Sequence, residues 1–97
     1  MNILKWLEKS GSTKILLTLV EYEKLTITQL QKRSGVVSNT LYDRLKELEK
    51  KKLINREERA IEEPDYIFRR VVFISLTPKG KKVAEKLMEI KRIMEEE

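Results

Sequence analysis

Polar side chains gather at the start of one predicted helix, residues 38–50. Within it, Leu41, Leu45 and Leu48 recur at helical spacing, which is the pattern of a helix with one buried face. When that face turns inward, the polar side chains at the start of the helix are Ser38, Asn39, Thr40, Tyr42, Asp43 and Lys46.

These residue types suit duplex DNA. Asn39 is able to form paired hydrogen bonds with adenine, and a hydroxyl of Ser38 or Thr40 is placed to bind a phosphate near the helix N-terminus. Tyr42 offers either an apolar contact with a thymine methyl group or a hydrogen bond to phosphate. Arg44 lies beside the leucine stripe and is expected to interact with its own fold. The alternative interpretation is an ordinary solvated helix surface.

Catalysis and metal binding have little support in the composition. The sequence contains neither cysteine nor histidine, so disulfides and thiolate metal sites are excluded and the usual general base is missing. We find no grouping of a nucleophile with a base and no glycine-rich phosphate loop. We therefore expect no catalytic residues, no metal and no cofactor, and do not expect an enzyme.

The positive charge of the chain is unevenly distributed. The formal net charge is +5, and residues 1–56 hold 12 Lys and Arg against 6 Asp and Glu, whereas residues 57–75 hold 3 against 5. A basic surface attracts phosphate backbones, although a merely solvated surface has the same composition. Lys and Glu occur 14 times each, a bias that is typical of proteins from hot environments.

A second helix precedes residues 38–50 and is joined to them by a short turn. We expect Thr28 to cap a helix over residues 28–34, with Gln31 completing a capping box, and Gly35 to end it. Ser38 is then expected to cap the following helix. Two helices with such a turn match a helix-turn-helix, in which Thr28 is a further candidate DNA contact.

The remaining segments predict a small α+β domain that is mostly α and covers residues 1–97. Helices are expected over residues 2–9, over residues 12–22 with Ser12 as cap, and over residues 78–97 with Thr77 as cap and Pro78 in the first turn. Residues 24–27 read as a short extended segment, and residues 53–56 and 69–76 as two strands that pair with each other. The polar residues 57–67 between them read as a loop or hairpin tip.

Two stretches resemble a known family. Residues 38–56, SNTLYDRLKELEKKKLINR, and residues 76–87, LTPKGKKVAEKL, are similar to the MarR-type and PadR-type winged-helix regulators of archaea and bacteria, over roughly residues 12–90. The resemblance implies a winged helix-turn-helix fold with a three-helix core, a small antiparallel hairpin as the wing and a long C-terminal helix. It also implies that helix 38–50 enters the major groove of DNA, with Ser38, Asn39, Thr40, Tyr42, Asp43 and Lys46 as contacts. Arg56, Arg59, Arg69 and Arg70 would flank or occupy the wing.

The chain departs from this family in two places. Lys52 stands where the family usually has glycine, and a left-handed backbone costs a non-glycine residue free energy, so either Lys52 bears this cost or the turn differs from that of the family. The wing is also acidic, through Glu57, Glu58, Glu62, Glu63 and Asp65, and acidic groups repel phosphate. The wing therefore either contacts DNA through arginines such as Arg69 and Arg70, or avoids DNA and contacts a protein.

The helices at the two ends carry apolar stripes that need a partner. We expect them to form a homodimer, as is common among proteins of this resemblance, through Ile3, Leu4, Trp6, Leu7, Leu87, Ile90 and Met94. Packing within the chain's own core is the alternative. A two-fold dimer would place two reading helices about 34 Å apart, one turn of DNA.

The expected partners are thus double-stranded DNA and a second copy of the chain. A small-molecule effector is left open by the sequence, and at this length it would have to bind in the dimer interface. No apolar run approaches the roughly 20 residues of a membrane span, so we expect a cytoplasmic protein without a membrane partner. The competing hypothesis is a winged-helix protein-interaction module of a larger complex, which the acidic wing and the terminal helices favour.

Overall fold

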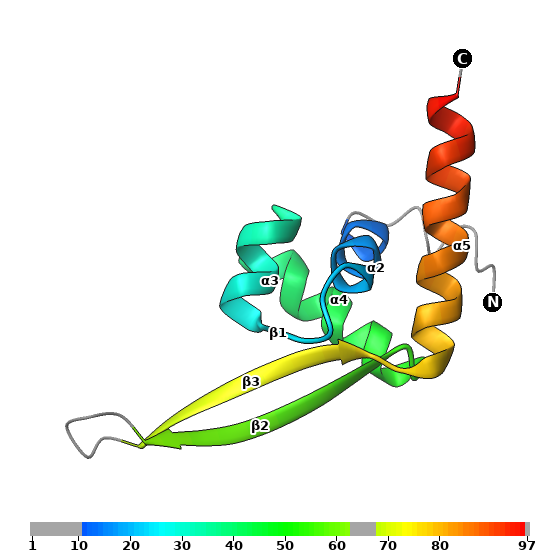
Figure 1. Cartoon of the computed structure of the whole chain (residues 1–97). Coiled ribbons are helices and arrows are strands. Elements are labelled where there is room, and N and C mark those ends of the chain that lie inside the picture. Colours follow the sequence, from blue (N-terminus) through cyan, green and yellow to red (C-terminus); the bar gives the residue numbers. More distant parts are fainter. Residues whose placement is uncertain (1–10, 63–67, 97) are drawn as a thin grey trace.

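The computed structural model describes residues 11–62 and 68–96, and these form four helices and three strands. Their order along the chain is α2 (Ser12–Val20), β1 (Leu25–Thr26), α3 (Ile27–Ser34), α4 (Ser38–Lys50), β2 (Ile54–Glu62), β3 (Phe68–Leu76) and α5 (Pro78–Glu95). The helix expected over residues 2–9 lies outside the described residues. Three core helices, a hairpin and a long last helix are the predicted winged-helix arrangement, which is confirmed (Figure 1).

The core lies between the helices, including the first half of α5, and the base of the sheet. Each helix turns one apolar stripe inward, and the predicted leucine stripe of α4 is buried as expected. The buried core side chains are Ile15, Leu16, Leu19, Leu25, Leu30, Val36, Leu41, Leu45, Leu48, Leu53, Ile54, Ile74, Leu76 and Ala84. This packing fixes which side of α4 faces away from the protein.

The sheet is antiparallel, with strand order β1-β3-β2. β2 and β3 pair without interruption from Ile54 with Leu76 to Glu62 with Phe68, and together they project away from the helices as the wing (Figure 1). The prediction that residues 57–67 form a loop is wrong as far as residue 62. The charged residues there lie beyond the core, where both faces of a strand are solvated, so no apolar alternation marks them as a strand.

The helix caps differ from the expected ones. Thr26, not Thr28, caps α3, because the chain is still extended at Thr26 where β1 ends. Its hydroxyl oxygen accepts from the Gln29 backbone N–H at 3.1 Å, and the Gln29 side chain accepts from the Thr26 N–H at 3.0 Å. The capping box therefore lies two residues earlier than the predicted pair of Thr28 and Gln31.

Two predicted serine caps are also wrong. Ser12 is the first residue of α2, and the cap is Gly11 in a left-handed conformation with φ 95°. The left-handed backbone favours glycine there, and a Cβ would also be tightly placed, 3.1 Å from Val36 Cγ1. Ser38 is likewise the first residue of α4, and Val37 occupies the cap position in an extended conformation.

The end of α4 is tied to the start of α5. Lys52 has φ 60°, so it adopts a left-handed conformation at the position where the resembling family has glycine. The Thr77 hydroxyl donates to the Lys52 carbonyl at 2.7 Å and accepts from the Gly80 N–H at 2.9 Å. The Thr77 N–H donates to the Leu53 carbonyl at 3.1 Å. Thr77 thus caps α5, as predicted, and also satisfies carbonyls that follow α4.

None of the helices in residues 11–62 and 68–96 is long and apolar enough to cross a membrane.

The start of α5 lies close to the turn that follows α4, and this close approach requires glycine at position 80. A Cβ on Gly80 would lie 1.9 Å from the Leu53 carbonyl oxygen, so Gly80→Ala must force α5 away from the turn. We expect the substitution to lower the free energy of unfolding by about 3 kcal/mol, measured by urea denaturation. The control is Lys82→Ala, an exposed position of the same helix, which should change it by about 0.5 kcal/mol or less. Equal stability of the two variants would contradict the close approach.

Candidate nucleic-acid interface

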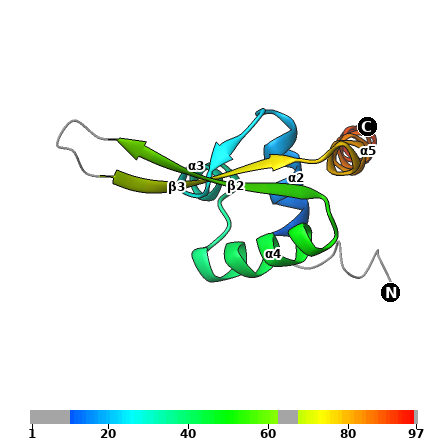
Figure 2. The same cartoon turned by 90° about the horizontal axis from the view of Figure 1, so that it is seen from below.

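The outer side of α4 is the candidate interface. In Figure 2, α4 runs along one side of the molecule with no other described element over it, and the β2–β3 hairpin projects beyond its start. Asn39, Asp43 and Lys46 are exposed, and Tyr42 is 51% exposed. A helix with one buried stripe and a free polar side is the form that fits into a major groove.

Backbone N–H groups at the start of α4 have no side-chain cap among residues 11–62 and 68–96. The first N–H groups of a helix have no partner within it, and no side chain caps them in α4, whereas threonines cap α3 and α5. Backbone N–H groups at a helix N-terminus attract anions. Ser38, the first residue of α4, is exposed at this N-terminus.

Ser38 also holds the two helices of the motif together. Its hydroxyl oxygen accepts a hydrogen bond from Gln31 Nε2 at 2.6 Å, which links α3 to the first residue of α4. The hydroxyl proton of Ser38 remains available for another acceptor. Gln31 was predicted as part of a helix cap, and no local sequence pattern indicates its contact across the turn.

Two of the predicted contacts lie at the margin of this surface. Thr40 is half-buried, and its methyl carbon would lie 3.4 Å from a Cβ placed on Gly11. It therefore packs beside the start of α2 rather than pointing fully outward. Thr28 is exposed in the first turn of α3, two residues before the buried Leu30.

The arginines of the wing are engaged by neighbouring glutamates. Arg59 Nε lies 2.7 Å from Glu57 Oε1, and Arg70 Nη1 lies 4.0 Å from Glu58 Oε2. The Arg59 guanidinium also lies 5.5 Å from the centre of the Phe73 ring, within range of a cation–π interaction. The side chain of Arg69 is outside the described residues. Glu57 therefore offsets the charge of Arg59, whereas the pair of Glu58 with Arg70 is long and highly exposed.

The Arg59 contact affects the ionisation of its partner. The hydrogen bond from Arg59, followed by the attraction of its charge and that of Lys24, lowers the pKa of the Glu57 carboxyl below its ordinary value. Glu57 is therefore ionised at neutral pH and offsets the charge of Arg59 there.

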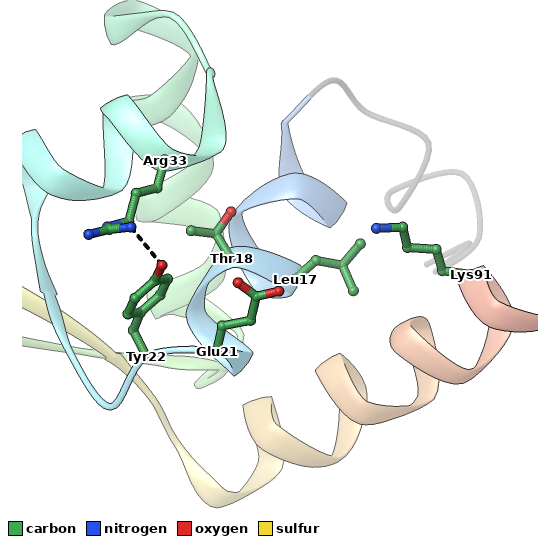
Figure 3. Close-up of a pocket in the computed structure, with 6 residues that line it drawn as sticks. All are labelled: Leu17, Thr18, Glu21, Tyr22, Arg33 and Lys91. Atoms are coloured by element: carbon green, nitrogen blue, oxygen red, sulfur yellow. Dashed lines mark hydrogen bonds between the residues drawn. The ribbon is translucent and has the colours of Figure 1, made fainter.

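A surface hollow lies between α2, α3 and α5 (Figure 3). At its edge, Arg33 Nη1 donates to the Tyr22 hydroxyl at 2.6 Å, and the guanidinium lies 4.4 Å from the centre of the Tyr22 ring. The hollow has a volume of about 360 Å³, and its lining residues are Leu17, Thr18, Glu21, Tyr22, Arg33 and Lys91. The sequence predicted neither this contact nor this hollow, because both depend on the packing of three separate helices.

The sequence matches the family described as "Sugar-specific transcriptional regulator TrmB" over residues 9–73. This range includes the helix-turn-helix and most of the wing. The chain belongs to the TrmB family. A transcriptional regulator of the winged-helix type, predicted from the sequence by resemblance to MarR-type and PadR-type proteins, is thereby confirmed. No curated protein sequence matches this TrmB-family chain significantly.

Solved structures of similar fold include regulators from bacteria and archaea. The MarR family transcriptional regulator SPO1453 from Silicibacter pomeroyi DSS-3 superposes with a TM-score of 0.72 at 22% identity, covering 96% of this chain and 61% of that one. The transcriptional regulator homologue protein from Pyrococcus horikoshii OT3 gives 0.70 at 20% identity, covering 97% and 95%. AF1382 from Archaeoglobus fulgidus gives 0.72 at 23% identity, covering 99% and 100%. At these identities the likeness shows the fold. The TrmB-family chain spans about three fifths of the Silicibacter protein.

The ion pair in the wing makes a prediction about ionisation. In Arg59→Ala the hydrogen bond that stabilises the Glu57 carboxylate is lost, so the pKa of Glu57 is expected to rise toward its ordinary value. Carbon-13 NMR titration of the glutamate carboxyls measures this pKa. The control is Arg70→Ala, which removes the partner of Glu58 and should leave Glu57 unchanged. A Glu57 pKa that is the same with and without Arg59 would rule out this pairing.

Proposed function

We propose that this regulator binds duplex DNA as a homodimer and inserts α4 into the major groove. The observation that carries the proposal is the start of α4, where exposed polar side chains surround backbone donors that no side chain caps. Asn39 is the candidate base-reading residue, since its amide offers a donor and an acceptor to one adenine edge. Ser38 and the adjacent N–H groups are the candidate phosphate contacts.

The charges near α4 support a polyanionic partner. Lys32, at the end of α3, and Lys46 and Lys50, on α4, are exposed. Lysines that neutralise phosphates release bound counterions, and this makes affinity fall steeply with salt. Thr28 and the wing residues Arg59, Arg69 and Arg70 are proposed as secondary contacts that flank the groove. Asp43 would sit on the reading side, where it disfavours close phosphates and suits an amino group of cytosine.

The second half of α5 supports the homodimer. α5 continues past α2 (Figure 1) and leaves Ile90, Ile93 and Met94 exposed by 56%, 58% and 79%. Of the predicted dimerisation residues, Leu87 is half-buried against its own core, whereas Ile90 and Met94 are free to meet a partner. The residues proposed before Ser12, Ile3 to Leu7, lie outside the described part. A second copy is the proposed occupant because a two-fold axis would pair identical stripes and present two copies of α4 to one side of DNA.

A protein-interaction module is the alternative, and the wing favours it. The wing arginines Arg59 and Arg70 are paired with glutamates, so this hairpin offers less free positive charge than a second DNA anchor needs. A partner protein would then occupy the wing or the exposed stripe of α5.

Asn39→Ala tests the base-reading assignment. Duplexes selected from a random pool by the parent protein should bind the variant at least tenfold more weakly, because a paired contact with a base contributes about 1–3 kcal/mol of discrimination. Binding to random duplexes should change little. Fluorescence anisotropy over a range of salt concentrations measures both, with Lys82→Ala as the matched control. Equal losses on selected and random duplexes would refute base reading, and absence of binding at low salt would favour the protein-interaction module.

The double variant Ile90→Ser/Ile93→Ser tests the dimer. Burial of each isoleucine side chain contributes about 1.5–3 kcal/mol, so the variant is expected to be monomeric at concentrations where the parent is dimeric. Analytical ultracentrifugation gives the masses. Arg92→Ser changes the same helical turn on another side and should leave the dimer intact. A parent that sediments as a monomer would exclude this part of the proposal.

A further inference from the structure

Exposed apolar side chains occur at two places in the described part of the chain. Ile90, Ile93 and Met94 lie in the second half of α5, and Val37 and Tyr42 lie at the start of α4. Val37 is 68% exposed, although it belongs to the otherwise polar end of the reading helix.

The side chain of Val37 neither caps α4 nor packs into the core. It occupies the cap position of α4, where Ser, Thr, Asp or Asn would bond the free N–H groups and valine leaves them without a side-chain partner. The apolar contact that often accompanies a helix start joins the residue before the cap to the fourth helical residue. Here those residues are Val36 and Leu41, and both are buried. Val37 therefore gives up helix stability and, at 68% exposure, gains little burial among the described residues.

A residue that weakens a helix start and gains little packing in return points to an external partner. The major groove of DNA contains one apolar group, the C5 methyl of thymine, and apolar side chains contact it. Val37 is at the cap position of α4, next to N–H groups that no described side chain caps, and the exposed Tyr42 lies five residues further along. Five residues correspond to a rotation of about 140° around a helix, so the two side chains would contact different parts of the groove once α4 is inserted.

We propose that Val37, together with the ring of Tyr42, reads thymine methyl groups in the major groove and so sets part of the sequence preference. This inference rests on the proposed DNA-binding function. Asn39 lies between Val37 and Tyr42 in the sequence and would form hydrogen bonds with a neighbouring base. Polar and apolar contacts would thus alternate along the start of α4.

The test replaces thymine by uracil, which lacks only the methyl group. The full chain first selects its preferred duplexes from a random pool at low salt. Each thymine of the best duplex is then replaced in turn by deoxyuridine, and binding is measured by fluorescence anisotropy. For the parent protein, at least one replacement should weaken binding about fourfold, the effect of one methyl group removed from an apolar contact.

Val37→Ser is the informative variant because it removes the apolar contact and restores a favourable helix cap. It should unfold at a higher urea concentration than the parent, so weaker binding is not a consequence of misfolding. It should bind the thymine duplex about fourfold more weakly and no longer distinguish thymine from uracil at the sensitive position. Tyr42→Phe keeps the ring and removes the hydroxyl, and it should retain the sensitivity at its own position.

Three outcomes would overturn the inference while leaving DNA binding intact. These are preferred duplexes without thymine, tolerance of uracil at every position by the parent, and unchanged uracil discrimination in Val37→Ser. Failure of the parent to bind any duplex at low salt would instead refute the proposed function, and the inference with it.

Discussion

The arrangement of this protein depends on the hydrogen bonds of Thr77. One hydroxyl caps α5 through the Gly80 N–H and at the same time donates to a carbonyl just after α4. The Thr77 N–H adds a second bond to the same turn, at Leu53. Because both helix ends share these bonds, α4 and α5 are held at a fixed angle. If α5 pairs with a second copy, this junction is what relates the two reading helices to each other.

The wing shows how local charge pairing changes the use of a common element. The hairpin carries arginines, but Glu57 lies beside Arg59 on the same strand, and Glu58 lies near Arg70 across the ladder. Exposed ion pairs of this kind contribute little to stability. Their main effect is electrostatic. The positive field that the hairpin presents to a partner is weaker than the number of arginines suggests. DNA recognition by this chain would therefore depend on the start of α4 more than on the hairpin.

The sequence predicted those features that strong periodicity or glycine and proline signals encode. The bounds of α4 followed from its leucine stripe and the turn before it, and the position of α5 followed from Thr77 and Pro78. The resemblance marked the position of Lys52, but the sequence left open whether its turn is left-handed. The cap of α3 was misplaced because Thr26 and Thr28 each have a glutamine three residues later, and only the end of β1 selects between them. The outer part of β2 was missed because its charged residues have no buried face. Contacts between distant segments, such as Gln31 with Ser38 and Arg33 with Tyr22, leave no local pattern.

The geometry of the sheet has a consequence for solubility. β1 contains two residues, which pair with Ile74 and Phe73. Among the described residues, most of β3 beyond β1 therefore has an unpaired edge, as β2 has on its outer side. Open strand edges invite addition of a strand from another chain and lead to aggregation. The run from Arg56 to Arg59 places two cations and two anions along the outer strand, and an incoming strand would have to bury or displace them. The glutamates that weaken the attraction of the wing for phosphate thus also protect the hairpin against self-association.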